Sequence, residues 1–167
     1  MTFDLNEIPD DKKFEDLVVS YFENLKHLKG HSITDVAVKP SGKGSDGGRD
    51  ILITLDVTDT IATFKKRWVV QCKFHNTSIS TDKIADINIP TLLHSYKASG
   101  YLLVCKQKPT SKLTNLFEQL ETNCIFERKY EVWSGEQFKT RLINNEQILQ
   151  QFFPNYFDYI TKLKQST

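Results

Sequence analysis

Hydrophobic and polar positions alternate with a helical period near the start of the chain. Between residues 10 and 30, apolar side chains recur three and four positions apart, which is the spacing of one face of an amphipathic helix. Asp10 or Asp11 can accept hydrogen bonds from the first backbone N–H groups of this helix, and Gly30 can end it. The apolar face consists of Phe14, Leu17, Val18, Tyr21, Phe22, Leu25 and Leu28.

Three extended segments are predicted after the first helix. Residues 32–40 favour a short strand that Pro40 closes. Residues 50–57 and 67–74 form two further runs of strand-forming side chains.

Helices and strands alternate through the second half of the chain. Residues 80–100 have a helical pattern that Pro90 interrupts or restarts. Ser134 and Gln137 have the spacing of a capping box, which predicts the start of another helix. The other predicted elements are a buried strand at 101–105, a helix at 110–123, a strand at 124–133, a helix at 134–144 and a helical segment at 145–164 that breaks at Pro154.

This order of elements predicts the fold class. A series of strands followed by a crossover helix is typical of an α/β fold, with a central mixed β-sheet flanked by helices on both faces. The 167 residues are enough for a sizeable core, and we expect residues 1–167 to form a single domain.

A hairpin with its turn near Thr60 and Ile61 would align the second and third extended segments. In this register Asp50 lies directly opposite Gln71, and Lys73 lies on the same side as both, because side chains alternate across a strand. Directly facing residues have Cβ atoms about 4.5–5.5 Å apart, so these side chains can share one ligand. The opposite face is entirely apolar and consists of Ile51, Ile53, Leu55, Val57, Trp68, Val70, Cys72 and Phe74.

The polar face suits a divalent metal ion and a phosphate. The Asp50 carboxylate and the Gln71 amide oxygen are hard donors that fit Mg²⁺ or Mn²⁺, and the Cys72 backbone carbonyl can supply another oxygen. Lys73 can stabilise negative charge on a phosphodiester, or orient and deprotonate a water.

The glycine-rich segment GSDGGRD leads directly into this polar face. Gly47 and Gly48 allow backbone amides to approach a phosphate closely. Lys39, Lys43 and Arg49 flank the same place, where their charges can contact phosphates. We therefore expect the nucleic-acid-binding residues around this loop.

The residues DGGRD followed by QCK resemble the PD-(D/E)xK nuclease signature in its QxK variant. The longer stretches GSDGGRDILIT and WVVQCKFH are most similar to the catalytic domain of Mrr-type restriction endonucleases. The likeness extends to the helix KKFEDLVVSYFENL and to the strand and helix YLLVCKQKPTSKLTNLFEQL, and so covers most of residues 10–145.

The resemblance implies a Mg²⁺-dependent DNA endonuclease of the restriction-endonuclease-like fold, acting in restriction or anti-phage defence. It makes Asp50 the central metal ligand, puts Gln71 in place of the usual glutamate, and makes Lys73 the catalytic lysine. Glu15 matches the acidic residue on the first helix of the family. DNA is the expected partner. The Mrr recognition domain has no counterpart in this sequence, so either specificity is low or another chain or segment supplies targeting.

Composition narrows the class of protein but does not identify it. The formal net charge is +1, which excludes a strongly basic histone-like protein while permitting a local basic patch. No apolar run is long enough to span a membrane and no charged-then-apolar leader opens the sequence, so we expect a cytoplasmic protein without a membrane partner. Cys72, Cys105 and Cys124 lack metal-binding spacing, which favours buried, reduced thiols.

Each candidate residue also has a purely structural interpretation. Asp50 can cap a glycine turn, Gln71 can be a polar residue of an edge strand, and Lys73 can be a solvated surface lysine. Glu15 lies in the first turn of a helix, where an acid complements the helix dipole in any case. The joint placement of the first three residues favours a site.

Two other functions use the same residues. A Holliday-junction resolvase-like nuclease would have the same fold and similar chemistry. A catalytically decayed DNA-binding or assembly module would retain the fold, with Gln71 marking the loss of a metal ligand. If the protein cuts both strands of a duplex, it needs two active sites, which predicts a homodimer or a larger assembly.

Overall fold

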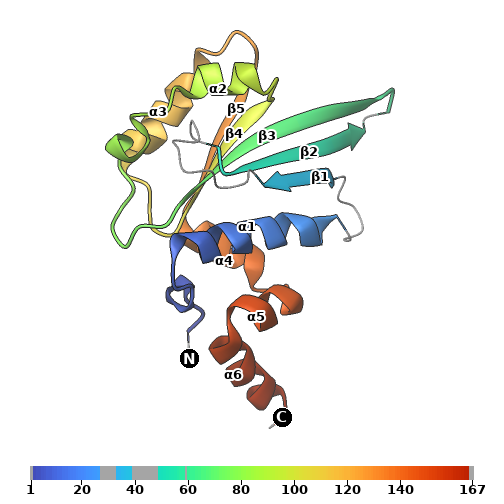
Figure 1. The fold of residues 1–167 in the computed structure, drawn as a ribbon, viewed down its shortest axis with the longest axis vertical. Coiled ribbons are helices and arrows are strands. Elements are labelled where there is room, and N and C mark those ends of the chain that lie inside the picture. The colour runs from blue at the N-terminus through green and yellow to red at the C-terminus, as the bar shows by residue number, and fades with distance from the viewer. Residues whose placement is uncertain (1, 27–32, 39–48, 59, 166–167) are drawn as a thin grey trace.

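The computed structural model describes residues 2–26, 33–38, 49–58 and 60–165 (Figure 1). Its strands are β1 (Ile33–Val38), β2 (Ile51–Thr58), β3 (Thr63–Lys73), β4 (Gly100–Cys105) and β5 (Lys129–Trp133). Its helices are the 3-10 turns η1 (Leu5–Glu7) and η2 (Thr81–Ile84), and α1 (Asp11–Leu25), α2 (Ile89–Ser95), α3 (Ser111–Thr122), α4 (Gly135–Leu142), α5 (Glu146–Phe152) and α6 (Pro154–Gln165).

The strands form one mixed sheet in the order β1-β2-β3-β4-β5. The first three strands are antiparallel neighbours, whereas β3, β4 and β5 run parallel. The parallel pairs are joined by helical crossovers, as parallel connections require. The predicted fold class, a mixed sheet with helices on both faces, is confirmed.

Both faces of the sheet are buried against helices (Figure 1). On one face, Ile51 and Val70 pack with Phe14 of α1 and Phe138 of α4. On the other face, Val69 packs in a second cluster under α2 and α3. Burying one apolar side chain of this size stabilises the folded protein by about 1.5–3 kcal/mol. Both clusters therefore contribute to packing the helices on the sheet.

The register predicted for the β2–β3 hairpin is confirmed. Ile51 pairs with Val70 and Thr58 with Thr63, which is the same alignment that sets Asp50 opposite Gln71. The apolar face of the hairpin contributes to the first core, with Ile53 and Cys72 buried and Trp68 packed against them.

Local capping signals read from the sequence are also confirmed. The Asp10 carboxylate accepts a 2.7 Å hydrogen bond from the Lys13 backbone N–H at the start of α1. Ser134 and Gln137 form a reciprocal capping box at the start of α4, since each side chain accepts from the other residue's backbone N–H.

The predicted restart of the helical pattern at Pro90 is confirmed. Residues 80–100 divide into η2 and α2, because Pro90 lies in the first turn of α2 and Asn88 caps that helix. One strand prediction was wrong in extent. The strand predicted at 124–133 begins only at Lys129, since Glu127 has a positive φ of 53° that ends extended backbone there. Gly30, the predicted end of the first helix, lies outside the described residues.

All three cysteines are free thiols. Cys72 and Cys105 are buried as predicted, but Cys124 is only partly buried, because it lies in the turn after α3 and not in a strand. Burial raises the pKa of the Cys105 thiol to about 12. Among the residues that the structure describes, no helix is long and apolar enough to cross a membrane.

Candidate metal and phosphate site

Asp50 and Gln71 are in direct contact at the end of the β2–β3 hairpin. The Gln71 Nε2 donates a 2.7 Å hydrogen bond to Oδ2 of Asp50. The same carboxylate oxygen accepts a 2.6 Å hydrogen bond from the Cys72 backbone N–H. The carboxylate therefore joins the two strands at the point where their ladder stops.

The end of the ladder explains why the Asp50 carboxylate takes this position. Regular pairing of β2 with β3 ends at Ile51 and Val70, and the Asp50 backbone N–H donates to the Val70 carbonyl at 2.9 Å. The Cys72 N–H thus lies beyond the last β2 backbone partner, and the side chain of Asp50 satisfies it.

The backbone around Cys72 also places its carbonyl. The neighbouring Lys73 carbonyl faces β4, where it accepts a 3.0 Å hydrogen bond from the Lys106 N–H. Successive backbone groups of a strand alternate in direction, so the Cys72 carbonyl faces the opposite side, on which Asp50 lies.

Two buried side-chain atoms among the described residues have no hydrogen-bond partner, and both flank Asp50. One is Oε1 of Gln71, a residue that is only 8% exposed. The other is Nε of Arg49, the residue directly before Asp50. A buried acceptor and a buried donor without partners are costly, and they suit a cation and an anion respectively.

Charges near the site act on buried groups around it. Burial raises the pKa of the Cys72 thiol well above its usual range, and the nearby charges of Asp50 and Glu15 raise it further. Burial also raises the pKa of the Tyr101 hydroxyl, again with a contribution from Asp50. Both groups are therefore protonated at neutral pH, so neither competes with Asp50 as an anion.

Lys73 lies two residues beyond Gln71 on the same side of β3, and its side chain is half-buried. The pKa of His75 is lowered from 6.5, chiefly by desolvation and also by the charges of Lys83 and Lys73, while Asp82 opposes the shift. The Lys73 ammonium is therefore close enough to affect the titration of His75.

Glu15 approaches from the helix side of the sheet. It lies in the first turns of α1, is half-buried, and its charge reaches the Cys72 thiol. Helix α1 packs against β3, which brings this carboxylate toward the same strand as Gln71.

Only one of the predicted phosphate-binding residues, Arg49, belongs to the described part of the chain. The others lie outside the described residues: Lys39, Lys43, Gly47 and Gly48. Arg49 is described: its guanidinium lies over the ring of Tyr96, 4.4 Å from the ring centroid.

The Arg49–Tyr96 contact was not predicted from the sequence. Tyr96 follows α2, far from the signature residues, and carries no local pattern that marks it as part of a site. Arg67 of β3 donates from Nη1 to the Tyr96 carbonyl at 2.9 Å.

The donor set fits Mg²⁺ or Mn²⁺ better than zinc. The Asp50 carboxylate, the buried Gln71 Oε1 and the Cys72 carbonyl on the same side are all oxygens. The Glu15 carboxylate, whose charge reaches the Cys72 thiol, is an oxygen donor as well. Within the described residues, no group of three or more His, Cys, Asp or Glu side chains could hold a metal ion. A metal site here would therefore depend on amide and backbone oxygens in addition to carboxylates.

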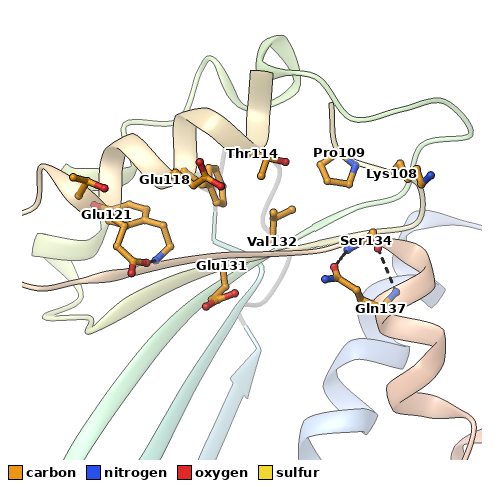
Figure 2. A pocket seen from close by; sticks show the side chains of 12 residues that line it. Lys108, Pro109, Thr114, Glu118, Glu121, Glu131, Val132, Ser134 and Gln137 are labelled. Atoms are coloured by element: carbon orange, nitrogen blue, oxygen red, sulfur yellow. Dashed lines mark hydrogen bonds between the residues drawn. The ribbon is translucent and has the colours of Figure 1, made fainter. Parts of the chain in front are cut away.

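A cavity of about 680 Å³ lies elsewhere, between α3 and β5 (Figure 2). None of the predicted site residues lines it. One of its carboxylates is already occupied: Glu121 accepts from Lys129 Nζ at 2.7 Å and from the Tyr130 N–H at 3.0 Å. These two hydrogen bonds lower the pKa of Glu121. The carboxylate thus protects the free edge of β5, which is a structural role.

Comparison with known proteins agrees with the fold. The Mrr catalytic-domain model, described as "Restriction endonuclease", matches residues 9–141. Among solved structures, the DNA modification-dependent restriction endonuclease AspBHI is similar with a TM-score of 0.50 and 12% identity, over 97% of this chain and 43% of its own. The MspJI restriction endonuclease, in complex with a 27-mer oligonucleotide, is similar with a TM-score of 0.55 and 14% identity, over 88% of this chain and 30% of its own.

No curated protein matches this chain in sequence. The two solved structures share the restriction-endonuclease-like fold with it, and at such low identity the likeness shows the fold alone. The chain spans less than half the length of either protein.

Proposed function

The chain belongs to the Mrr family of restriction endonucleases, nucleases that act on DNA, and from this membership we propose that it is a Mg²⁺- or Mn²⁺-dependent endonuclease. It hydrolyses DNA phosphodiester bonds at the site formed by Asp50, Gln71 and Lys73. Its proposed biological role is restriction or defence against foreign DNA.

The observation that carries this proposal is the buried, unpaired Oε1 of Gln71 beside the Asp50 carboxylate. A glutamine that served only the fold would be expected to satisfy both ends of its amide in a buried position. Here one end contacts Asp50, and the other is a buried oxygen without a protein partner, which is the kind of group that can coordinate a cation.

The proposed metal ligands are Asp50, Gln71 through Oε1 and the Cys72 carbonyl, with Glu15 as an accessory acid. When bound, a divalent cation would polarise a phosphoryl oxygen and offset its negative charge. The amide of Gln71 brings no charge, so the carboxylates and the DNA phosphate must balance the cation.

Lys73 is the proposed catalytic lysine. A water attacks phosphorus in line with the leaving 3′ oxygen, one P–O bond forms and the other breaks, and a proton reaches the leaving oxygen. As the ammonium, Lys73 stabilises the negative charge that grows on the phosphate; in the alternative, Lys73 as the neutral amine orients the water and accepts its proton. Its half-buried position leaves the ammonium accessible to a substrate.

The DNA backbone is proposed to bind beside this site. Arg49, Lys39 and Lys43 would contact phosphates, and the backbone amides of Gly47 and Gly48 would approach them closely. Cleavage of both strands requires two such sites, so we propose a homodimer or a larger assembly. A further domain or a partner protein would supply targeting, and the proposed location is the cytoplasm.

Cleavage of linear duplex DNA and of a four-way junction, each with Mg²⁺ and with EDTA, tests the substrate class. We expect Mg²⁺-dependent cleavage of linear duplex. Cleavage restricted to the junction would replace this proposal with a resolvase-like nuclease. Absence of cleavage together with absence of Mg²⁺ and Mn²⁺ binding in calorimetry, with DNA present, would indicate a decayed site.

A further inference from the structure

Arg49 is held in one orientation by an aromatic ring. Its guanidinium lies 4.4 Å from the centroid of the Tyr96 ring, and its Nε is buried without a hydrogen-bond partner. The ring covers one face of the guanidinium. The N–H groups of a guanidinium donate in its plane, along its edges, and not through its face. The contact therefore fixes the direction of the donors without occupying them.

Tyr96 is itself fixed to two elements of the fold. Its N–H donates to the Leu92 carbonyl at 3.2 Å, at the end of α2, and its carbonyl accepts from Arg67 of β3 at 2.9 Å. The ring packs against the second core, which lies under α2 and α3. The position of the Arg49 guanidinium is thus set by α2 and the sheet, although Arg49 precedes the first residue of β2.

The chemistry of the orphaned donor points to an anion with several oxygens. A guanidinium is always charged and presents its donors in a planar fork that matches a phosphate. Arg49 is the residue directly before Asp50 in the chain, so an anion bound to it would lie next to the candidate cation site. In a DNA nuclease, the anion expected at this place is a phosphate of the DNA backbone.

We propose that Tyr96 is a positioning residue that presents the Arg49 guanidinium to a backbone phosphate of the bound DNA. The inference rests on the proposed function, and it assigns to α2 a role that the signature residues do not include. It also predicts that the two residues act as one unit, because the ring contributes to binding only through the guanidinium.

A double-mutant cycle on DNA binding tests this coupling. The probe is a fluorescein-labelled duplex of random sequence, with Ca²⁺ in place of Mg²⁺ to prevent cleavage, and the measurement is Kd over about 50–200 mM salt. The variants are Arg49→Gln, Tyr96→Leu, the pair of them, and Tyr96→Phe, which keeps the ring. Circular dichroism and the thermal midpoint check that each variant is folded.

Arg49→Gln should raise Kd about tenfold or more and reduce the slope of log Kd against log salt by about one. Tyr96→Leu should raise Kd in the Arg49 protein but not in the Arg49→Gln protein, whereas Tyr96→Phe should bind as the wild type does. Lys65→Gln is the matched charge control, since Lys65 is exposed near the hairpin tip and pairs there with Asp56. It should leave Kd nearly unchanged.

Equal effects of Tyr96→Leu in both backgrounds would overturn the inference, because a merely structural role would be independent of Arg49. An unchanged Kd and salt slope in Arg49→Gln would overturn it as well. Cleavage by the wild-type protein with Mg²⁺, measured in parallel, separates the two levels. If the wild type cuts DNA but the effects of the two substitutions on Kd are additive, only the role of Tyr96 is contradicted. If the wild type neither binds nor cuts DNA, the proposed function is contradicted.

Discussion

The amide of Gln71 and the carboxylate of Asp50 meet across the β2–β3 hairpin, with 2.7 Å between Nε2 and Oδ2. This contact occupies the donor end of the amide and leaves the acceptor end buried and unpaired. A neutral amide does not repel a carboxylate. The Gln71–Asp50 contact therefore forms without a metal ion between the two side chains.

Replacement of Gln71 by glutamate tests that view of the amide. In Gln71→Glu two carboxylates would lie at hydrogen-bond distance, so the free energy of unfolding in EDTA should fall by about 1–3 kcal/mol. Mn²⁺ should then raise the thermal midpoint more than in the wild type, since the cation binds the folded form and relieves the repulsion. Differential scanning fluorimetry against Mn²⁺ concentration measures both effects.

Gln71→Leu is the control for this substitution, because it removes both ends of the amide. Its thermal midpoint should respond to Mn²⁺ less than that of the wild type. Equal responses of the wild type, Gln71→Glu and Gln71→Leu would show that the cation binds elsewhere.

The lysine on the same side of β3 should affect the chemical step more than DNA binding. Lys73→Met is expected to slow Mg²⁺-dependent cleavage at least about a hundredfold in single-turnover assays, because a group that stabilises the transition state is lost. The Kd for duplex DNA should change far less than the rate. A cleavage rate like that of the wild type would remove Lys73 from the mechanism.

The hairpin register is the part of the site that the sequence predicted best. Period-two alternation excludes a one-residue slip, which would turn the apolar face outward, and the turn placed near Thr60 and Ile61 selects the alignment. That alignment is observed from Ile51 and Val70 to Thr58 and Thr63. The capping box at Ser134 was equally predictable, because both partners are three residues apart.

The contacts that depend on tertiary packing were not predictable. Nothing in the sequence near Tyr96 indicates that its ring would lie under Arg49, since the contact forms only after α2 docks on the sheet. The hydrogen bond from the Cys72 N–H to the Asp50 carboxylate also forms only because the β2–β3 ladder ends at Ile51 and Val70. Sequence periodicity fixes element boundaries only to within a few residues.

His75 reports on the placement of Lys73. Its pKa is lowered in the folded protein, so folding favours the neutral imidazole. The associated stability is fully present above its usual pKa of 6.5 and is lost as the pH falls through the lower folded value. A ¹H–¹⁵N NMR titration should give a midpoint below 6.5 for His75.

Lys73→Met should move the His75 midpoint upward, because one of the nearby positive charges is removed. Lys65→Met, near the hairpin tip, should leave it unchanged. A His75 midpoint that does not respond to Lys73→Met would place the Lys73 ammonium away from His75.

Gly135 is required by close packing and not by backbone conformation. A Cβ at this position would meet the carbonyl oxygen of Lys106 directly after β4. Gly135→Ala should therefore lower the free energy of unfolding by about 1–3 kcal/mol, as overpacking does. Urea unfolding measures the loss, and a variant as stable as the wild type would mean that α4 can shift without cost.

Plasmid cleavage tests the central claim most directly: the protein is incubated with supercoiled DNA in Mg²⁺, in Mg²⁺ with excess EDTA, and as the Asp50→Ala variant in Mg²⁺. We predict nicked and linear products in the first sample only, with circular dichroism showing that the variant is folded. Cleavage that persists in EDTA, or in folded Asp50→Ala, would contradict a metal-dependent site at Asp50.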